Sequence, residues 1–196
     1  MSSFIIATSR RCTACGSAHE GWLPCENGPH GLSPKPKRPK PVILFIGPSG
    51  CGKDYACRYL AEKTGLIFWG SLSWVIAHEI AEQDGISPLD AMQHRHASRE
   101  RWRATGDAMR QSDPAFLVQT CLDHGANLLN GCRARIEFDV IRSRKLADLV
   151  IWIDRNGMKT DPTLELTSDD ADMIMNNDEQ FNARLDSLIS FVKAMA

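Results

Sequence analysis

One short stretch, residues 42–54, constrains the fold of this chain more than any other. It reads VILFIGPSGCGKD, a continuous apolar run followed by three glycines that lead to Lys53. An apolar run of this length is typical of a buried parallel strand, and residues 53–63 have a helical pattern. Between them, Gly47, Gly52 and Lys53 fit the spacing G-x-x-x-x-G-K, which turns backbone N–H groups around an anion at a helix N-terminus. The stretch therefore predicts a strand, a phosphate-binding loop (P-loop) and a helix in succession.

The side chains of this loop indicate how a nucleotide would be held. Lys53 is expected to reach the β- and γ-phosphates of ATP and to stabilise the charge that develops there. Asp54 stands where Ser or Thr commonly coordinates Mg²⁺, and a carboxylate is able to hold Mg²⁺ directly or through water. The alternative is a glycine-rich turn that binds nothing. The predicted ATP-binding residues are Gly47, Pro48, Ser49, Gly50, Cys51, Gly52, Lys53, Asp54 and Tyr55.

Strand-like and helix-like segments alternate from residue 42 onward. The predicted strands cover residues 42–46, 66–69, 127–129, 149–153 and 173–175. The predicted helices cover residues 53–63, 71–83, 89–92, 95–109, 114–124, 135–145 and 178–193. Alternation of this kind predicts an α/β fold, a three-layer sandwich with helices on both faces of a parallel sheet of about five strands.

A proline-rich segment divides the chain. Residues 31–41 read GLSPKPKRPKP, with four prolines and four basic residues that exclude a helix or a central strand and favour an extended linker. We therefore expect a head at residues 1–30, this linker, and a main domain at residues 42–196. Residues 1–41 carry six Lys/Arg against two Glu, a balance of +4, whereas the main domain has a balance of −5. Contact of residues 1–41 with nucleic acid or a protein partner is the resulting hypothesis.

The head has the residues of a metal site. Cys12, Cys15, Cys25 and His30 follow the spacing C-x2-C-x9-C-x4-H, and three thiolates with one imidazole make a tetrahedral Zn²⁺ site; His19 is an alternative fourth ligand. A head of about thirty residues has too small a hydrophobic core to fold without a stabilising metal ion of this kind. The other interpretations are a disordered tail with free thiols and a redox pair at Cys12 and Cys15.

Composition excludes some classes of protein. The cysteines of the main domain are scattered, which suits free thiols in a reducing cytosol better than a disulfide framework. No apolar run approaches the ~20 residues of a membrane span, and the run at residues 4–7 is too short for a signal peptide. The net charge of −1 gives no overall bias towards nucleic acid or membranes. A cytoplasmic location without membrane contact is expected.

Several segments, taken in order, resemble the phage-type deoxynucleoside monophosphate kinases. The P-loop ends in Lys-Asp, and WRATGDAMRQSDP at residues 102–114 is similar to the helix, Gly-Asp turn and Asp-Pro of those kinases. LNGCR at residues 129–133 resembles the strand end that holds the acceptor phosphate, and ADLVIWIDR at residues 147–155 the strand that leads into their lid. The resemblance covers about residues 42–194. It implies ATP- and Mg²⁺-dependent phosphorylation of a (deoxy)nucleoside monophosphate to the diphosphate.

Such a transfer needs cations more than a base, because the acceptor phosphate is already an anionic nucleophile. Lys53, Arg133 and Arg155 are the predicted catalytic cations, since both arginines follow predicted strands at the edge where α/β proteins bind ligands. Asp107 is predicted to contact a ribose or a Mg²⁺-bound water, or alternatively to cap the turn after Gly106. Glu137 is predicted to hold Arg133 or the acceptor base, or alternatively to form an ion pair on the helix surface. The predicted acceptor-binding residues are Arg99, Arg103, Asp107, Arg110, Arg133 and Glu137.

The sequence departs from the pattern of these kinases at three places. Tyr55 follows Lys-Asp where Thr is frequent, Asn130 stands at the strand end where Asp is frequent, and the predicted lid at residues 155–161 is short. Two alternative functions stay open. One is a P-loop kinase for another small metabolite, in which an alcohol acceptor would need a base such as Asp54 or Asp107. The other is a nucleotide-binding, nucleic-acid-associated protein that uses the head and linker.

Overall fold

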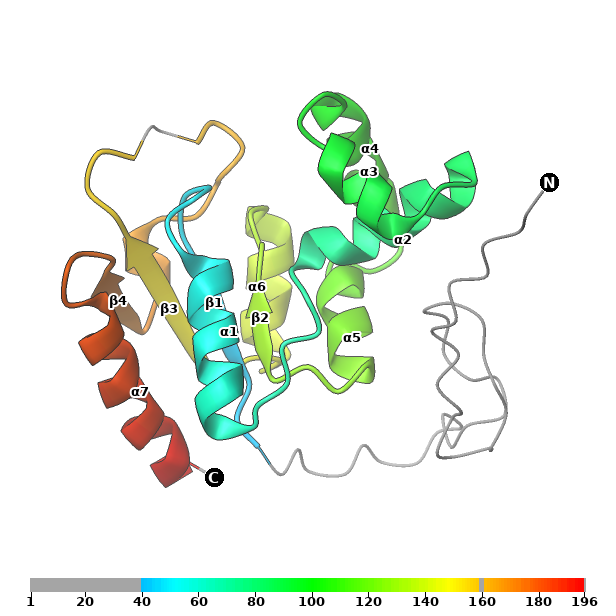
Figure 1. Ribbon diagram of the computed structural model, residues 1–196. Coiled ribbons are helices and arrows are strands. Elements are labelled where there is room, and N and C mark those ends of the chain that lie inside the picture. The colour runs from blue at the N-terminus through cyan, green and yellow to red at the C-terminus, as the bar shows by residue number, and fades with distance from the viewer. Residues whose placement is uncertain (1–39, 159–160, 196) are drawn as a thin grey trace, which may run out of the picture. The chain divides into compact units, whose positions relative to one another are not determined.

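The computed structural model describes residues 40–158 and 161–195 of the chain (Figure 1). The Cys/His-rich head and nearly all of the proline-rich linker lie outside these ranges. The predicted zinc ligands Cys12, Cys15, Cys25 and His30 therefore stay predictions, and so does the partner contact assigned to residues 1–41.

Within the described residues, four parallel strands form one sheet in the order β2-β1-β3-β4. The central strand β1 (Ile43–Ile46) pairs with β2 (Leu128–Asn130) on one side and with β3 (Leu149–Asp154) on the other. The outer strand β4 (Met173–Asn176) pairs with β3. The carboxyl ends of all these strands meet at one edge, where open parallel sheets bind their ligands.

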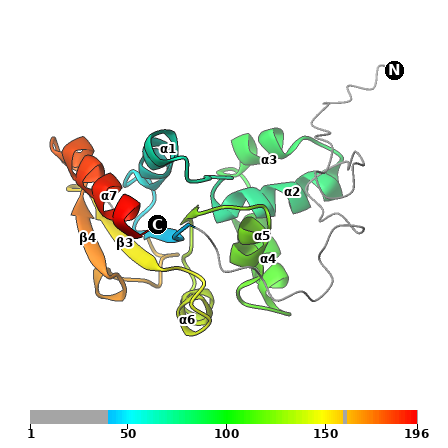
Figure 2. The same cartoon turned by 90° about the horizontal axis from the view of Figure 1, so that it is seen from below.

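Helices cover both faces of the sheet and make three layers, as expected from the sequence (Figure 2). On one face, Ile43 and Phe45 pack with α1 (Lys53–Thr64) and α7 (Phe181–Met195). On the other face, Leu44 and Ile46 pack with α2 (Leu72–Asp84), α5 (Phe116–Asp123) and α6 (Arg135–Ser143). Successive strand residues point to opposite faces, so the uninterrupted apolar run of β1 supplies both cores.

Two further helices pack on α2 beyond the β2 side of the sheet. The first, α3 (Pro88–His94), begins at a proline and is capped by Ser87, whose hydroxyl accepts a hydrogen bond from the Asp90 N–H at 3.1 Å. The second, α4 (Arg99–Arg110), begins four residues later than predicted, because residues 95–98 form turns. A short 3-10 turn, η1 (Ser168–Asp170), precedes β4.

The predicted strand at residues 66–69 is wrong, because the described sheet has four strands and this segment is not one of them. It does lie beside the start of β2, where the Ile67 carbonyl accepts hydrogen bonds from the N–H groups of Asn127 (2.8 Å) and Leu128 (3.0 Å). The Ile67 N–H donates to the Asn127 side chain at 3.3 Å. The Ile67 carbonyl thus accepts two hydrogen bonds, and the Ile67 N–H donates to a side chain. The backbone groups of Ile67 are satisfied by these local bonds, so residues 66–69 form no β-ladder with β2.

Two further observations concern membrane-spanning helices and the state of the cysteines. None of the helices in the described part of the chain is long and apolar enough to cross a membrane. The described cysteines are free thiols and all are buried: Cys51, Cys57, Cys121 and Cys132.

Candidate functional site: a phosphate-binding loop between two pockets

The loop between β1 and α1 needs glycine for steric reasons. Gly47 has φ 133°, and a Cβ there would lie 2.5 Å from the Ile153 carbonyl oxygen. Gly52 has φ 111°, and a Cβ there would lie 2.4 Å from Asn177 Nδ2. Side-chain-bearing residues rarely adopt these angles, and both positions also lack space for a methyl group. The two motif glycines therefore let the loop pack closely against the ends of β3 and β4.

Lys53 is turned into this loop. Its Nζ donates hydrogen bonds to the carbonyl oxygens of Gly47 (2.7 Å) and Pro48 (2.5 Å) and lies 3.4 Å from the Cys51 sulfur. Burial lowers the pKa of Lys53, and the charge of nearby Arg133 acts in the same direction. Two of the predicted catalytic cations therefore lie close enough for their charges to interact.

Asp54 and Asn130 form a second contact at the loop. Asp54 lies in the first turn of α1 and is exposed, whereas Asn130 at the end of β2 is 2% exposed. The Asn130 Nδ2 donates a hydrogen bond to Asp54 Oδ1 at 3.0 Å. The carboxylate predicted to hold Mg²⁺ is thus oriented by the end of the neighbouring strand.

A first pocket, of about 370 Å³, opens beside the start of α1. The Nδ2 of Asn177 donates to the Cys51 carbonyl at 2.7 Å, and its backbone N–H donates to the Asp154 carbonyl at 2.6 Å, so the loop after β4 is attached to the P-loop. Arg155 Nη1 approaches the Gly50 carbonyl at 3.4 Å. The pocket combines aromatic, cationic and polar groups and is lined by Gly52, Tyr55, Arg155, Asn177, Asp178, Glu179, Phe181 and Asn182.

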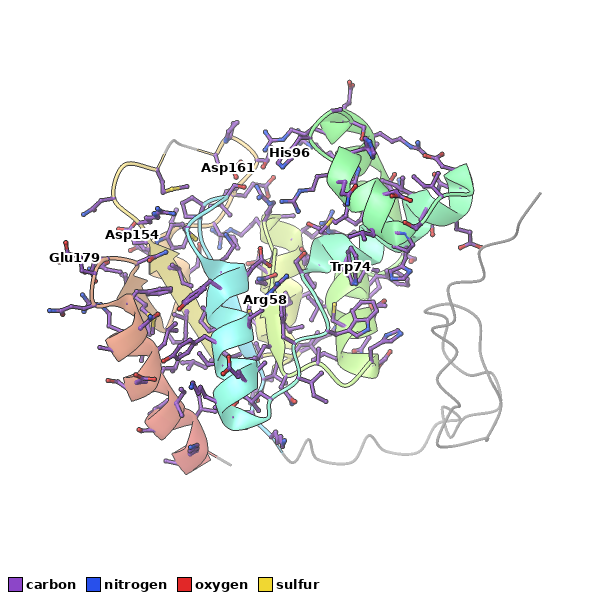
Figure 3. All side chains as sticks on the ribbon, in the orientation of Figure 1. Arg58, Trp74, His96, Asp154, Asp161 and Glu179 are labelled. Carbon is purple, nitrogen blue, oxygen red and sulfur yellow. The ribbon has the colours of Figure 1, made fainter. Side chains whose placement is uncertain are left out.

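A second pocket, of about 430 Å³, lies between the P-loop, the α2 and α4 helices and the segment after the predicted lid. It gathers most of the predicted acceptor residues: Arg99, Arg103, Asp107, Arg110 and Arg133. In the view of Figure 3, Glu179 of the first pocket lies to the left of α1 and His96 of the second to its right. The other lining residues are Ser49, Leu72, Ser73, Ile76, Arg95, His96, Glu100, Trp102, Gly106, Leu117, Gly131, Ala134, Pro162, Thr163 and Glu165.

Arg133 is held by the segment that follows the predicted lid. Its Nη1 donates to Asp161 Oδ2 at 2.6 Å and to Thr163 Oγ1 at 2.7 Å. Burial raises the pKa of Asp161, but hydrogen bonds from Thr163 and Arg133 and the charge of Arg133 outweigh it and leave that pKa at about 2. The Glu165 N–H donates to the Arg133 carbonyl at 3.0 Å, which fixes the segment at the pocket.

Glu137 is placed differently from the expectation that it contacts Arg133 or the acceptor. Its side chain has no exposed surface, and its Oε1 lies 3.5 Å from the Nε of Arg110. Burial raises the pKa of Glu137, and the charge of Arg110 partly offsets that rise. Arg110 also pairs with Asp107 at 3.2 Å. Glu137 is therefore not among the residues that line the second pocket, but it contacts Arg110, which does line it.

Several residues of the site were not among the site residues predicted from the sequence. Asn177, Asp161 and Thr163 contact the P-loop or Arg133 from segments far along the chain. The position of Asn177 directly after β4 is a usable signal, because the strand ends of a parallel sheet share one edge. Asp161 and Thr163 follow no strand end directly, and the path of their segment decides their partner.

Comparisons with known proteins give little. No protein-family model and no curated protein matches this sequence. Among solved structures, a shikimate kinase from Bacteroides thetaiotaomicron is 15% identical, with 78% of this chain and 98% of that chain covered and a TM-score of 0.39. A sugar kinase from Janibacter sp. HTCC2649 is 17% identical, with 79% and 95% covered and a TM-score of 0.44. Likenesses this distant carry no argument about activity.

The class of the protein rests on its own geometry. A parallel α/β sheet carries a glycine-rich loop of P-loop spacing between its central strand and the following helix, and a lysine lies inside that loop. The described residues thus form an α/β fold with a loop of P-loop spacing at the carboxyl edge of a parallel sheet, the edge at which such sheets bind ligands.

Proposed function

We propose that this chain is a kinase that transfers the γ-phosphoryl group of ATP to a (deoxy)nucleoside monophosphate and gives the diphosphate. The observation that carries the proposal is that two pockets of different chemistry meet at one P-loop. Gly52 of the loop lines the first pocket and Ser49 lines the second. A phosphoryl group bound to the loop would therefore face both a donor and an acceptor.

The first pocket suits the base and sugar of the donor. Tyr55 is 48% exposed and its ring centroid lies 6.1 Å from that of Phe181. Arg155, which directly follows β3, lines the same pocket. Aromatic rings and a guanidinium offer flat surfaces on which a nucleotide base stacks. The polar groups of Asn177, Asp178 and Asn182 supply hydrogen-bonding partners for its edges.

The first turn of α1 fits the Mg²⁺ ion that accompanies ATP. Asp54 offers an exposed carboxylate beside Lys53, and hard cations prefer oxygen ligands of this kind. When bound, Mg²⁺ would neutralise part of the charge of the β- and γ-phosphates.

The second pocket suits an acceptor that carries its own negative charge. Its arginines come from the α3–α4 turn, from α4 and from the end of β2, and they outnumber its carboxylates: Arg95, Arg99, Arg103, Arg110 and Arg133 against Glu100, Asp107 and Glu165. Guanidinium groups bind phosphate oxygens in pairs. Arg103, Arg110 and Arg133 already pair with carboxylates. Arg95 and Arg99 form no ion pair within the described part of the chain, and a phosphorylated acceptor would supply a negative charge for them where a neutral alcohol would not.

The described residues supply what this transfer needs without a general base. Lys53 lies in the P-loop and Arg133 lines the second pocket, close enough for their charges to interact, and both would stabilise negative charge on the transferring group. The hydrogen bonds from Arg133 to Asp161 and Thr163 fix its guanidinium beforehand. Preorganised cations of this kind, together with positioning, provide most of the rate increase in phosphoryl transfer.

An assay of ADP release tests the proposal. ATP and Mg²⁺ are combined with each common deoxynucleoside and ribonucleoside monophosphate, including modified dCMP, and with neutral sugar alcohols as acceptors. We expect turnover with one or a few monophosphates. Lys53→Ala should lose at least about a thousandfold, because it removes a cation from the transferring group. Lys63→Ala is the matched control, since Lys63 is an exposed lysine in the last turn of the same helix.

The other outcomes are equally informative. Turnover with alcohols and not with monophosphates would contradict the acceptor assignment and favour a metabolite kinase with a base such as Asp107. ATP binding without turnover on any acceptor would contradict the kinase proposal and favour a nucleotide-binding protein of another class.

A further inference from the structure

This chain differs from the common P-loop pattern at two positions, and the side chains at these two positions contact each other. In P-loop proteins, Mg²⁺ is usually held by the Ser or Thr after the loop lysine and by an Asp at the end of a neighbouring strand. This chain has Asp54 at the first position and Asn130 at the second. The two residues lie on different elements, yet Asn130 Nδ2 donates a hydrogen bond to Asp54 Oδ1 at 3.0 Å.

The burial of Asn130 indicates that this contact has a role. Asn130 is 2% exposed, and its Oδ1 is buried without a hydrogen-bond partner among the described residues. The thiol of Cys57 is also buried and interacts with the Asn130 side chain. An apolar side chain would avoid the cost of a buried polar atom without a partner. The Asn130 side chain thus has a buried oxygen without a hydrogen bond, and its charge-assisted hydrogen bond is the one to the Asp54 carboxylate.

We propose that the carboxylate and its neutral partner have exchanged places in this protein. Asp54 supplies from α1 the one negative charge that other P-loop proteins place at the strand end. Asn130 is a positioning residue: it holds Oδ1 of Asp54 and leaves the other carboxylate oxygen for the Mg²⁺ that accompanies the nucleotide. The inference rests on the proposed binding of Mg²⁺–nucleotide at the loop, and it is independent of the acceptor.

The location of Asp54 makes the exchange electrostatically reasonable. Asp54 lies in the first turn of α1, where the helix dipole stabilises a carboxylate. Lys53, the preceding residue, places a cation beside this carboxylate. The exchange leaves the local charge of the pair at −1 and moves it from the strand to the helix.

An exchange of the two side chains tests this directly. Asp54→Asn with Asn130→Asp is isosteric, restores one amide and one carboxylate, and keeps the net charge. It is compared with each single variant and with Glu62→Gln, which removes one exposed carboxylate from the other end of α1. The measurements are the calorimetric affinity for ATP with and without Mg²⁺ and the binding of Mn²⁺ with ATP by electron paramagnetic resonance.

We expect Asp54→Asn to reduce the Mg²⁺-dependent gain in ATP affinity about ten- to a hundredfold, the size of effect seen when metal-site partners are removed. Affinity without Mg²⁺ should not fall, because a negative charge near the phosphates has been removed. Asn130→Asp should also weaken Mg²⁺–ATP binding, because two adjacent carboxylates repel and lose their hydrogen bond. The double variant should regain most of the loss.

Two results would overturn the inference. One is an Asp54→Asn protein whose Mg²⁺ dependence equals that of Glu62→Gln. The other is a folded double variant that binds Mg²⁺–ATP no better than Asp54→Asn alone. If the variants that carry Asn130→Asp fail to fold, the comparison of Asp54→Asn with Glu62→Gln still decides whether Asp54 serves the metal. Because the readout is binding, failure of the kinase proposal would appear separately, as absence of turnover in the wild-type protein.

Discussion

Gly52 is the residue at which backbone angle and close packing coincide. An alanine Cβ there would collide with Asn177 Nδ2 and break the hydrogen bond from Asn177 to Cys51. Gly85 is a natural control: it also has positive φ, at 65°, but a Cβ there meets nothing within 4 Å. Both substitutions place a side chain at positive φ, but the 111° of Gly52 lies further outside the left-handed region than the 65° of Gly85, and only Gly52→Ala also creates a collision.

We expect Gly85→Ala to cost about 1 kcal/mol of stability, the penalty of the left-handed conformation. Gly52→Ala should cost about 1–3 kcal/mol. It should also weaken ATP binding about tenfold or more, equivalent to about 1.4 kcal/mol. Urea unfolding and calorimetric titration measure both effects. Equal ATP affinity in the two variants would contradict the close packing described at the loop.

Asp161 gives a prediction that depends on pH. Its pKa in the folded protein is about 2, against an ordinary value of 3.8. A carboxyl group with a depressed pKa stabilises the fold above its ordinary pKa, and that contribution is lost as pH falls through its folded pKa. The shift corresponds to about 2 kcal/mol. Asp161→Asn should therefore lower the free energy of unfolding by about this amount at neutral pH.

The difference between wild type and Asp161→Asn should shrink as the pH falls from about 4 towards 2. Urea unfolding at several pH values measures it. The control is Asp139→Asn, which removes an exposed carboxylate 4.0 Å from Arg135 and should change stability by less than about 0.5 kcal/mol. A pH-independent difference would show that the ionised form of Asp161, which accepts hydrogen bonds from Thr163 and Arg133, is not what stabilises the fold.

At the level of helices, the ion pair of Arg110 and Glu137 joins α4 to α6 across the wall of the second pocket. Burial raises the pKa of Glu137, so the folded protein binds this proton more tightly than the unfolded chain. Stability from this group accordingly falls as pH rises above the ordinary value of 4.5. The contact with Glu137 holds the Arg110 guanidinium at the wall of the second pocket.

Replacement of the whole pair separates stability from function. We expect Arg110→Met with Glu137→Met to be at least as stable as wild type, whereas Glu137→Gln alone is less stable, because it leaves Arg110 without its buried partner. Both proteins should show a KM for the acceptor raised about tenfold and an unchanged KM for ATP. An unchanged acceptor KM in the double variant would mean that Arg110 does not contact the acceptor.

The sequence predicted elements better than it predicted contacts between them. The apolar runs of β1, β2 and β3 were sufficient to predict these strands, because burial on both faces imposes an uninterrupted apolar pattern, whereas the edge strand β4 has only Met175 buried. The run at residues 66–69 has the same pattern, but strand pairing is settled by its neighbours, and there the Asn127 side chain replaces a backbone partner. Local composition carries no information on that competition.

Within the site, the residues of the P-loop were predictable because one motif specifies backbone, glycines and lysine together. The arginines were predictable only as candidates for phosphate binding. In the structure, four of them line the second pocket and Arg155 lines the first; the four are Arg99, Arg103, Arg110 and Arg133. The partners that orient them were not predictable. Asp161 lies 28 positions from Arg133, and such a contact depends on the path of the whole segment.

For the molecule as a whole, the head at residues 1–30 makes an independent prediction. If Cys12, Cys15, Cys25 and His30 form the predicted site, the purified full-length protein should contain about one zinc ion per chain, measured by mass spectrometry of the metal. Cys25→Ser should lose it, whereas Cys121→Ser, at a buried cysteine of the main domain, should keep it. Absence of zinc from the wild-type protein would contradict the assignment.

The most direct test of the central claim, that a phosphoryl group passes from the first pocket to the second, is a label-transfer experiment. The protein is incubated with Mg²⁺, ATP labelled at the γ-phosphate and the nucleoside monophosphate that gives the highest ADP release, and the products are separated by chromatography. We predict that the label appears in the nucleoside diphosphate and that Lys53→Ala abolishes the transfer. Label that appears only as free phosphate, or that stays in ATP with every monophosphate, would contradict the account.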